Sequence, residues 1–158
     1  MNKVFVFIAL SIMFGCTSKK SPPVDISLAE KILLLQTDKA FSDMSIEKGM
    51  KAAFIEYIDS NGVLLKPNQL PIVGANAIDY LIEQNDTGYT LNWQPQYAYV
   101  ASSADLGYTY GIYALHPNNI DTVIYGTYVS IWQKQGDGKW KFVLDSRNEG
   151  IDSTITNF

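Results

Sequence analysis

Apolar residues in the first half of the chain recur at helical spacing. Between residues 27 and 45 they repeat every three to four positions, which predicts an amphipathic helix. Ser27 and Glu30 form the S-x-x-E pattern of a capping box, a typical helix start. Two further runs, at 50–57 and 74–82, have the same spacing. The N-terminal half therefore predicts three helices.

Beyond Gly88 the pattern changes to the two-residue alternation of strands. Ahead of that glycine, "DSNG" at 59–62 predicts a turn and "VLL" at 63–65 a short strand. Eight of the ten tyrosines and all three tryptophans follow Gly88, as strand propensity favours. Four strands are predicted there, near residues 89–102, 106–115, 122–134 and 139–146. Helices followed by a meander of antiparallel strands predict an α+β domain.

Two positions in the strand region are predicted to interrupt regular strand structure. Pro95 cannot donate a sheet hydrogen bond, so we expect a bend or an edge position there. The "GDG" segment at 136–138 predicts a tight hairpin between the last two strands.

The segment "SADLGYTYGIYAL", residues 103–115, separates tyrosines from glycines. Tyr108 and Tyr110 point to one face of the predicted strand, and Gly107 and Gly111 to the other. Glycine within a strand marks a bend, a close backbone approach or a ligand. We therefore expect a curved sheet wrapped around the helices, with aromatic side chains closing the hollow. Alternation alone leaves open which face meets the helices.

The N-terminus precedes this domain and has a different character. Lys3 is followed by apolar and small residues from 4 to 14, a run too short to cross a bilayer as a helix but suited to a secretory signal. Gly15 and Cys16 come next, and the segment resembles a bacterial lipoprotein signal, in which the cysteine is lipidated and becomes the mature N-terminus. Cys16 is the only cysteine, so no disulfide can form within the chain. A cleaved signal that happens to contain a cysteine, or a free thiol, is the alternative.

The expected organisation is a signal peptide at 1–15, a lipidated cysteine with a tether at 16–26, and a single domain at 27–158. The resemblance implies three acyl chains, which would hold the protein firmly, whereas one chain binds a membrane only marginally. We expect an exported protein on the periplasmic side of the inner membrane or on the outer membrane.

The charge and the numbers of basic residues and histidines limit the partners and cofactors that the domain is expected to bind. The net charge is −4, and no lysine or arginine occurs between Lys66 and Lys134. Nucleic-acid binding needs basic side chains set against phosphates, so we expect no nucleic-acid partner. His116 is the only histidine and has no nucleophile or orienting acid in its motif, which favours a loop residue. Because the domain has no second histidine and no glycine-rich phosphate loop, we expect it to bind no metal and no cofactor.

Other candidate groups allow two interpretations each. Asp105 could face a cavity as an acid or base, but its "ADLG" setting is typical of a turn. Asp145 and Arg147 could pair with each other or reach the mouth of a cavity. Five aromatic side chains could line a pocket for a flat apolar ligand, or could form the core between helices and sheet: Trp93, Tyr108, Tyr110, Tyr128 and Trp132.

Four segments carry a family resemblance: "DKAFSDMSIEKGMKAAFIEYIDSNGVLLKP", "IVGANAIDYL", "ADLGYTYGIY" and "GTYVSIWQKQGDGKWKFVLD". The chain resembles the nuclear transport factor 2-like superfamily over about residues 28–150, nearest to the group called domain of unknown function 4440. The resemblance implies a cone-shaped α+β fold, shared with ketosteroid isomerases and polyketide cyclases, and homodimers that pair through their sheets. It implies no single activity, since the fold hosts enzymes, binders and assembly domains.

The isomerase mechanism within that superfamily needs a carboxylate base, a tyrosine and a protonated aspartic acid. The resemblance places these near Lys66, Phe41 and Tyr128. Lys66 is not an acid and Phe41 has no hydroxyl, so of the two oxyanion donors only the one at Tyr128 is retained. The isomerase chemistry therefore does not transfer. We expect a non-catalytic module for a small apolar or aromatic molecule. The alternatives are an enzyme that uses Asp105 or Tyr128 with Lys66, and a dimeric assembly domain.

Overall fold

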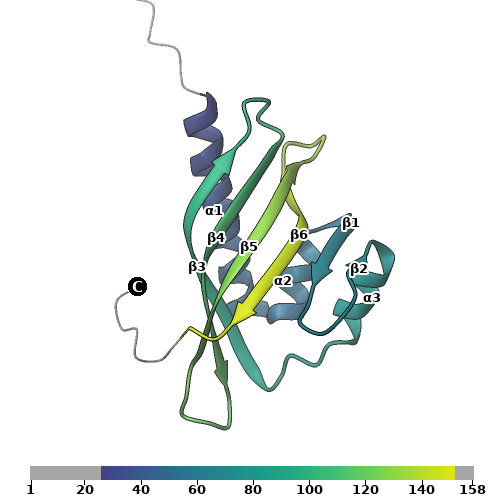
Figure 1. Ribbon diagram of the computed structural model, residues 1–158, viewed down its shortest axis with the longest axis vertical. Helices are drawn as coiled ribbons and strands as arrows, with labels where there is room; N and C mark the ends of the chain where they lie inside the picture. The colour runs from purple at the N-terminus through teal and green to yellow at the C-terminus, as the bar shows by residue number, and fades with distance from the viewer. Residues whose placement is uncertain (1–25, 152–158) are drawn as a thin grey trace, which may run out of the picture.

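A long helix crosses one face of a six-stranded sheet in the computed structural model, which describes residues 26–151 (Figure 1). The three helices are α1 (Ile26–Lys48), α2 (Met50–Tyr57) and α3 (Ala75–Glu83). Each falls within a few residues of its predicted range. Gly49, with φ of 89°, separates α1 from α2, because that backbone conformation ends a helix and favours glycine.

The six strands lie in the order β2-β1-β6-β5-β4-β3. Their bounds are β1 (Ile58–Leu65), β2 (Ile72–Val73), β3 (Tyr89–Val100), β4 (Leu106–Pro117), β5 (Ile124–Lys134) and β6 (Trp140–Glu149). The predicted antiparallel meander is confirmed for β3 to β6. Two features differ from the prediction: β1 pairs in parallel with β6, and the segment predicted as a turn at 59–62 lies within β1, at an irregularity of its register.

Helix α1 protects the open edge of the sheet. Strand β3 is an edge strand, as Pro95 indicated, and its backbone needs partners other than another strand. The hydroxyl of Ser42 donates to the carbonyl of Trp93 and accepts from its N–H, both at 2.8 Å. Ser45 donates to the carbonyl of Leu91 at 2.7 Å. Buried serines on α1 therefore complete the hydrogen bonding of β3.

The glycine face of the strands is the face that meets the helices. Gly107, Gly111 and Gly126 are buried, and their neighbours leave no room for a side chain. A Cβ atom on Gly126 would lie 2.5 Å from the Tyr113 ring and 2.3 Å from the carbonyl oxygen of Asn148. Glycines in these strands thus let large rings pack directly on the sheet backbone.

We expect Gly126→Ala to lower the free energy of unfolding by about 1–3 kcal/mol, the usual cost of overpacking. Urea denaturation measures this. Gly136→Ala is the control, because nothing lies within 4 Å of the added Cβ atom. Equal stabilities of the two variants would contradict the close packing of the glycine face.

Two β-bulges decide which way several side chains face. The register of β3 shifts between Pro95 and Tyr97, and that of β5 against β6 shifts beside Trp132. Before the first bulge, Leu91 and Trp93 face the helices; after it, Ala98 does, and Tyr97 points outward. Because the side-chain period of a strand is two, one extra residue exchanges the two faces.

Some predictions lie outside the described residues: the signal peptide, Cys16, nearly all of the tether, and the side chain of Ser27. None of the helices within 26–151 is both long and apolar enough to cross a membrane.

Candidate functional site

One carboxylate, Asp38 of α1, lies inside the aromatic core. Its side chain is fully buried. The indole N–H of Trp93 donates to Oδ1 and the hydroxyl of Tyr128 donates to Oδ2, both at 2.7 Å. Burial raises the pKa of Asp38 above its ordinary value, more than these hydrogen bonds lower it. Asp38 thus connects α1 to β3 and β5.

The five aromatic residues predicted to line a pocket do not come together. Trp93, Tyr128 and Trp132 are core side chains, exposed by 6%, 5% and 0%. The indole N–H of Trp132 donates to Thr109 Oγ1 at 2.8 Å. Tyr108 and Tyr110 lie on the opposite, outer face of the sheet and are about two-fifths exposed (38% and 44%). Protein side chains therefore fill the hollow at this depth.

A smaller cavity remains at one end of the core, where α2 and α3 meet the ends of β1, β4 and β6. We call it the mouth pocket. Its volume is about 180 Å³. The residues lining it are Met50, Lys66, Pro67, Tyr80, Leu81, Gln84, Tyr89, Leu91, Tyr113, Leu115, Arg147 and Glu149. It is mostly apolar and aromatic, with two cations, as small-molecule sites commonly are.

Arg147 enters the mouth pocket from β6 and lies against aromatic rings. Its guanidinium carbon is 4.5 Å from the ring centroid of Phe54 and 5.7 Å from that of Trp93. Its Nε lies 3.5 Å from Oδ1 of Asp145, which is buried and also accepts a hydrogen bond from Ser130. The two roles that the sequence left open for Arg147 therefore occur together: it pairs with Asp145 and it lines the pocket.

Lys66 is the second cation of the mouth pocket. It is half-buried, and within residues 28–151 its amine has neither an ion pair nor a hydrogen bond. Burial, and next the positive charge of Arg147, lower the pKa of Lys66, while Asp145 opposes the shift. Burial also raises the pKa of Tyr89 and Tyr113, so both phenols stay protonated and can donate hydrogen bonds.

Neither Asp105 nor Tyr128, the two candidate partners of Lys66 in the alternative acid–base set, lies beside Lys66. Asp105 is exposed in the connection between β3 and β4, where it accepts from the Ser103 hydroxyl. That connection lies beside the start of β6, whereas Lys66 lies beside its end. Tyr128 points to Asp38, which raises its pKa further after burial. In the described range, no three histidine, cysteine, aspartate or glutamate side chains cluster as metal ligands would.

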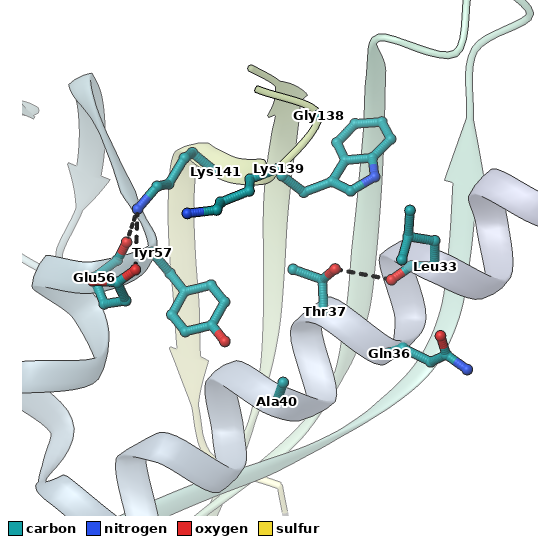
Figure 2. A pocket seen from close by; sticks show the side chains of 10 residues that line it. Leu33, Gln36, Thr37, Ala40, Glu56, Tyr57, Gly138, Lys139 and Lys141 are labelled. Atoms are coloured by element: carbon teal, nitrogen blue, oxygen red, sulfur yellow. Dashed lines mark hydrogen bonds and ion pairs between the residues drawn. The ribbon is translucent and has the colours of Figure 1, made fainter. Parts of the chain in front are cut away.

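Figure 2 shows a larger hollow, of about 480 Å³, between α1, the end of α2 and the hairpin before β6. Its charged group nearest α2 and its one threonine already have partners, whereas the indole N–H of Trp140, which also lines it, has none among the described residues. Lys141 lies 3.7 Å from the carboxylate of Glu56, and the Thr37 hydroxyl donates to the Leu33 carbonyl at 2.9 Å (Figure 2). Lys139 is mostly exposed, with 71% of its side chain accessible. Because the mouth pocket is more enclosed and holds an unpaired cation, we assign the candidate site to it.

Sequence reasoning missed the tyrosines of this site and left the direction of Arg147 open. Tyr113 could have been found, because alternation places it opposite Tyr108 on the face of Gly111. Arg147 could not, because counting alternate residues from Trp140 points it outward until the β-bulge is known.

Comparison with known proteins supports the fold. No family model matches the sequence, and no curated protein does. A ketosteroid isomerase-like protein from Erwinia carotovora atroseptica superposes with a TM-score of 0.60 at 12% identity, over 76% of this chain and 96% of its own. A domain of unknown function with a cystatin-like fold from Nostoc punctiforme has a TM-score of 0.64 at 10% identity, over 80% of each chain. A nuclear transport factor 2-like superfamily protein from Salmonella enterica serovar Typhimurium has a TM-score of 0.62 at 11% identity, over 83% of this chain and 98% of its own. The chain therefore has the nuclear transport factor 2-like fold that the sequence resemblance implies. This fold is a cone-shaped, curved sheet around helices.

Proposed function

We propose that this protein is a lipid-anchored, non-catalytic binding protein that holds a small aromatic or apolar molecule in the mouth pocket. The observation that carries the proposal is the contrast within the core. Rings fill the interior around Phe41, whereas a cavity lined by Tyr80, Tyr89 and Tyr113 remains open at the mouth. The missing isomerase acids favour binding over catalysis. Cys16 in its lipoprotein-like setting supports the anchor.

Native mass spectrometry of the full chain, purified in mild detergent from its own host, tests both parts. We expect an extra mass that is lost on unfolding, and an unfolded chain that begins at Cys16 and carries acyl groups. Leu115→Trp should fill the mouth pocket and abolish the extra mass. Leu70→Trp, at a site 87% exposed, should retain it. A chain without a guest would contradict the binding function, and an unmodified Cys16 would contradict the anchor.

A specific observation also favours a second role, assembly of two copies through the outer face of the sheet. Tyr97 stacks on Tyr110 with ring centroids 5.7 Å apart, and Tyr99 on Tyr108 at 5.5 Å. The cross-strand rows that contain them continue without a charged residue, as Tyr97–Tyr110–Val129–Ser146 and Tyr99–Tyr108–Ile131–Leu144. An exposed aromatic face of this kind suits a protein partner, and a second copy offers an identical aromatic face, with the Lys31 amine 4.0 Å from the Tyr97 ring centroid at its edge.

We expect Tyr108→Glu to convert a dimer into a monomer, because each interface would bury two uncompensated carboxylates. Sedimentation equilibrium of the full chain in detergent measures the change. Gln133→Glu is the control, since this exposed residue of β5 lies outside the two tyrosine rows. A wild-type chain that is monomeric at high concentration would overturn this second role.

A further inference from the structure

The two cations of the mouth pocket have too few anions around them. The side chain of Arg147 is only 16% exposed, and the one ion pair it makes with a described residue joins its Nε to Asp145. Lys66 has no partner among the described residues. Lysine and arginine side chains are rarely buried unless paired, because removal from water disfavours the charged form.

The acidic groups near the pocket do not neutralise Lys66. Asp145 is buried and is already engaged by Ser130 and Arg147. Its effect on Lys66 is smaller than the opposing effect of Arg147. Glu149 lines the rim, where it is exposed and makes no ion pair with either cation. Water screens its charge, so the inner end of the pocket remains positive.

The pocket has the size and chemistry for a small anion with an apolar body. Its volume of about 180 Å³ is close to the roughly 150 Å³ of an apolar cavity that accepts benzene, and it is below the roughly 300–1,000 Å³ of sites for drug-sized ligands. Leu91, Tyr89 and Tyr113 form apolar and aromatic walls. An arginine fork matches a carboxylate, and a lysine supplies a compact second charge.

We propose that the mouth pocket binds a small organic carboxylate, about one ring in size, whose carboxylate group lies between Lys66 and Arg147. The inference rests on the proposed binding function and names the chemical class of its ligand. The unpaired lysine is then explained: it raises the energy of the empty protein and is compensated when the anion binds. Charged groups held at a cost to stability are typical of functional sites.

Benzoate and benzamide, titrated into the full chain in detergent and followed by NMR, separate charge from shape because the two molecules are nearly isosteric. We expect benzoate to bind at least tenfold more tightly than benzamide. Lys66→Met should weaken benzoate binding at least tenfold and leave benzamide unchanged, while Lys66→Arg should retain most of the affinity for benzoate. Lys139→Met, which removes an exposed lysine outside the pocket, is the matched control.

Stability provides a second readout that a structural lysine would not produce. The thermal midpoint of unliganded Lys66→Met should equal or exceed that of the wild type, because an uncompensated cation is removed. A marked decrease would assign Lys66 to the fold and overturn the inference. Equal binding of the two probes, unchanged benzoate binding by Lys66→Met, or no binding of either probe would also overturn it. The binding function itself would then still be decided by the guest mass in native mass spectrometry.

Discussion

Replacement of Asp38 by alanine is expected to lower the free energy of unfolding by about 3–5 kcal/mol. The change would leave the indole N–H of Trp93 and the hydroxyl of Tyr128 without an acceptor inside the core. Each buried unsatisfied donor costs about 1–3 kcal/mol, and the lost side chain adds a small cavity. Urea denaturation measures the loss.

Asp43→Ala is the matched control for this prediction. Asp43 lies on the same helix, pairs with Lys39 and keeps 47% of its side chain accessible. Exposed pairs contribute about 0–1 kcal/mol, so this variant should remain close to the wild type. If Asp38→Ala lowers the free energy of unfolding by less than about 1 kcal/mol, water or a rearrangement must satisfy the donors of Trp93 and Tyr128. That result would contradict the prediction that both donors depend on Asp38.

The pH dependence of stability provides a further check on Asp38. Its pKa is raised in the folded protein, so the folded state holds the proton more tightly than the unfolded state does. The resulting stabilisation is complete below the unfolded value, near 3.8, and is lost as the pH rises through the folded pKa. Asp38→Asn cannot titrate. The stability difference between wild type and Asp38→Asn should therefore shift against the wild type as the pH rises above 3.8, and parallel curves would contradict it.

Phe41→Ala is expected to be comparably destabilising, by about 3–5 kcal/mol, the range for removing a large core ring. Phe41 is 1% exposed, and its ring lies 4.5–6.1 Å from five others: Phe54, Tyr57, Trp93, Trp132 and Phe142. These neighbours belong to several elements, so they cannot all collapse into the space. Chemical denaturation gives the value.

The control for Phe41 is Ile46→Ala, at a site 50% exposed on the same helix, where we expect less than about 1 kcal/mol. A small effect at Phe41 would mean that the interior is loosely filled. The deep hollow, rather than the mouth pocket alone, would then be available to a ligand. The prediction thus tests the packing argument on which the location of the site depends.

The sequence predicted the elements well because their patterns are local. Helical spacing, strand alternation and the turn at 136–138 each depend on residues close in the chain. The alternation within β4 also separated the face of Tyr108 from the face of Gly111 correctly, and the edge position of Pro95 followed from its missing N–H. The parallel pairing of β1 with β6 had no local signal, because it joins residues about 80 positions apart.

The candidate site was less predictable than the fold. One residue inserted at a bulge turns Asp145 and Arg147 toward the helices, and another turns Tyr97 outward. The hydrophobic pattern of the sequence does not reveal where a β-bulge lies. It therefore does not show which face of the sheet the residues after the bulge occupy. Tyr108 and Tyr110 were predicted to line a pocket but lie on the outer face of the sheet. Alternation defines two faces of a strand but not which of them the helices cover.

The sequence by itself determined the α+β class, the order of the elements and the aromatic content of the sheet, since these follow from backbone periodicity and side-chain propensity. Only the tertiary structure decided that glycines face the core, that Asp38 bridges two aromatic side chains, and that Lys66 and Arg147 share one pocket. Those outcomes depend on the curvature and register of the sheet, which arise when distant segments pack and compete for the same buried space.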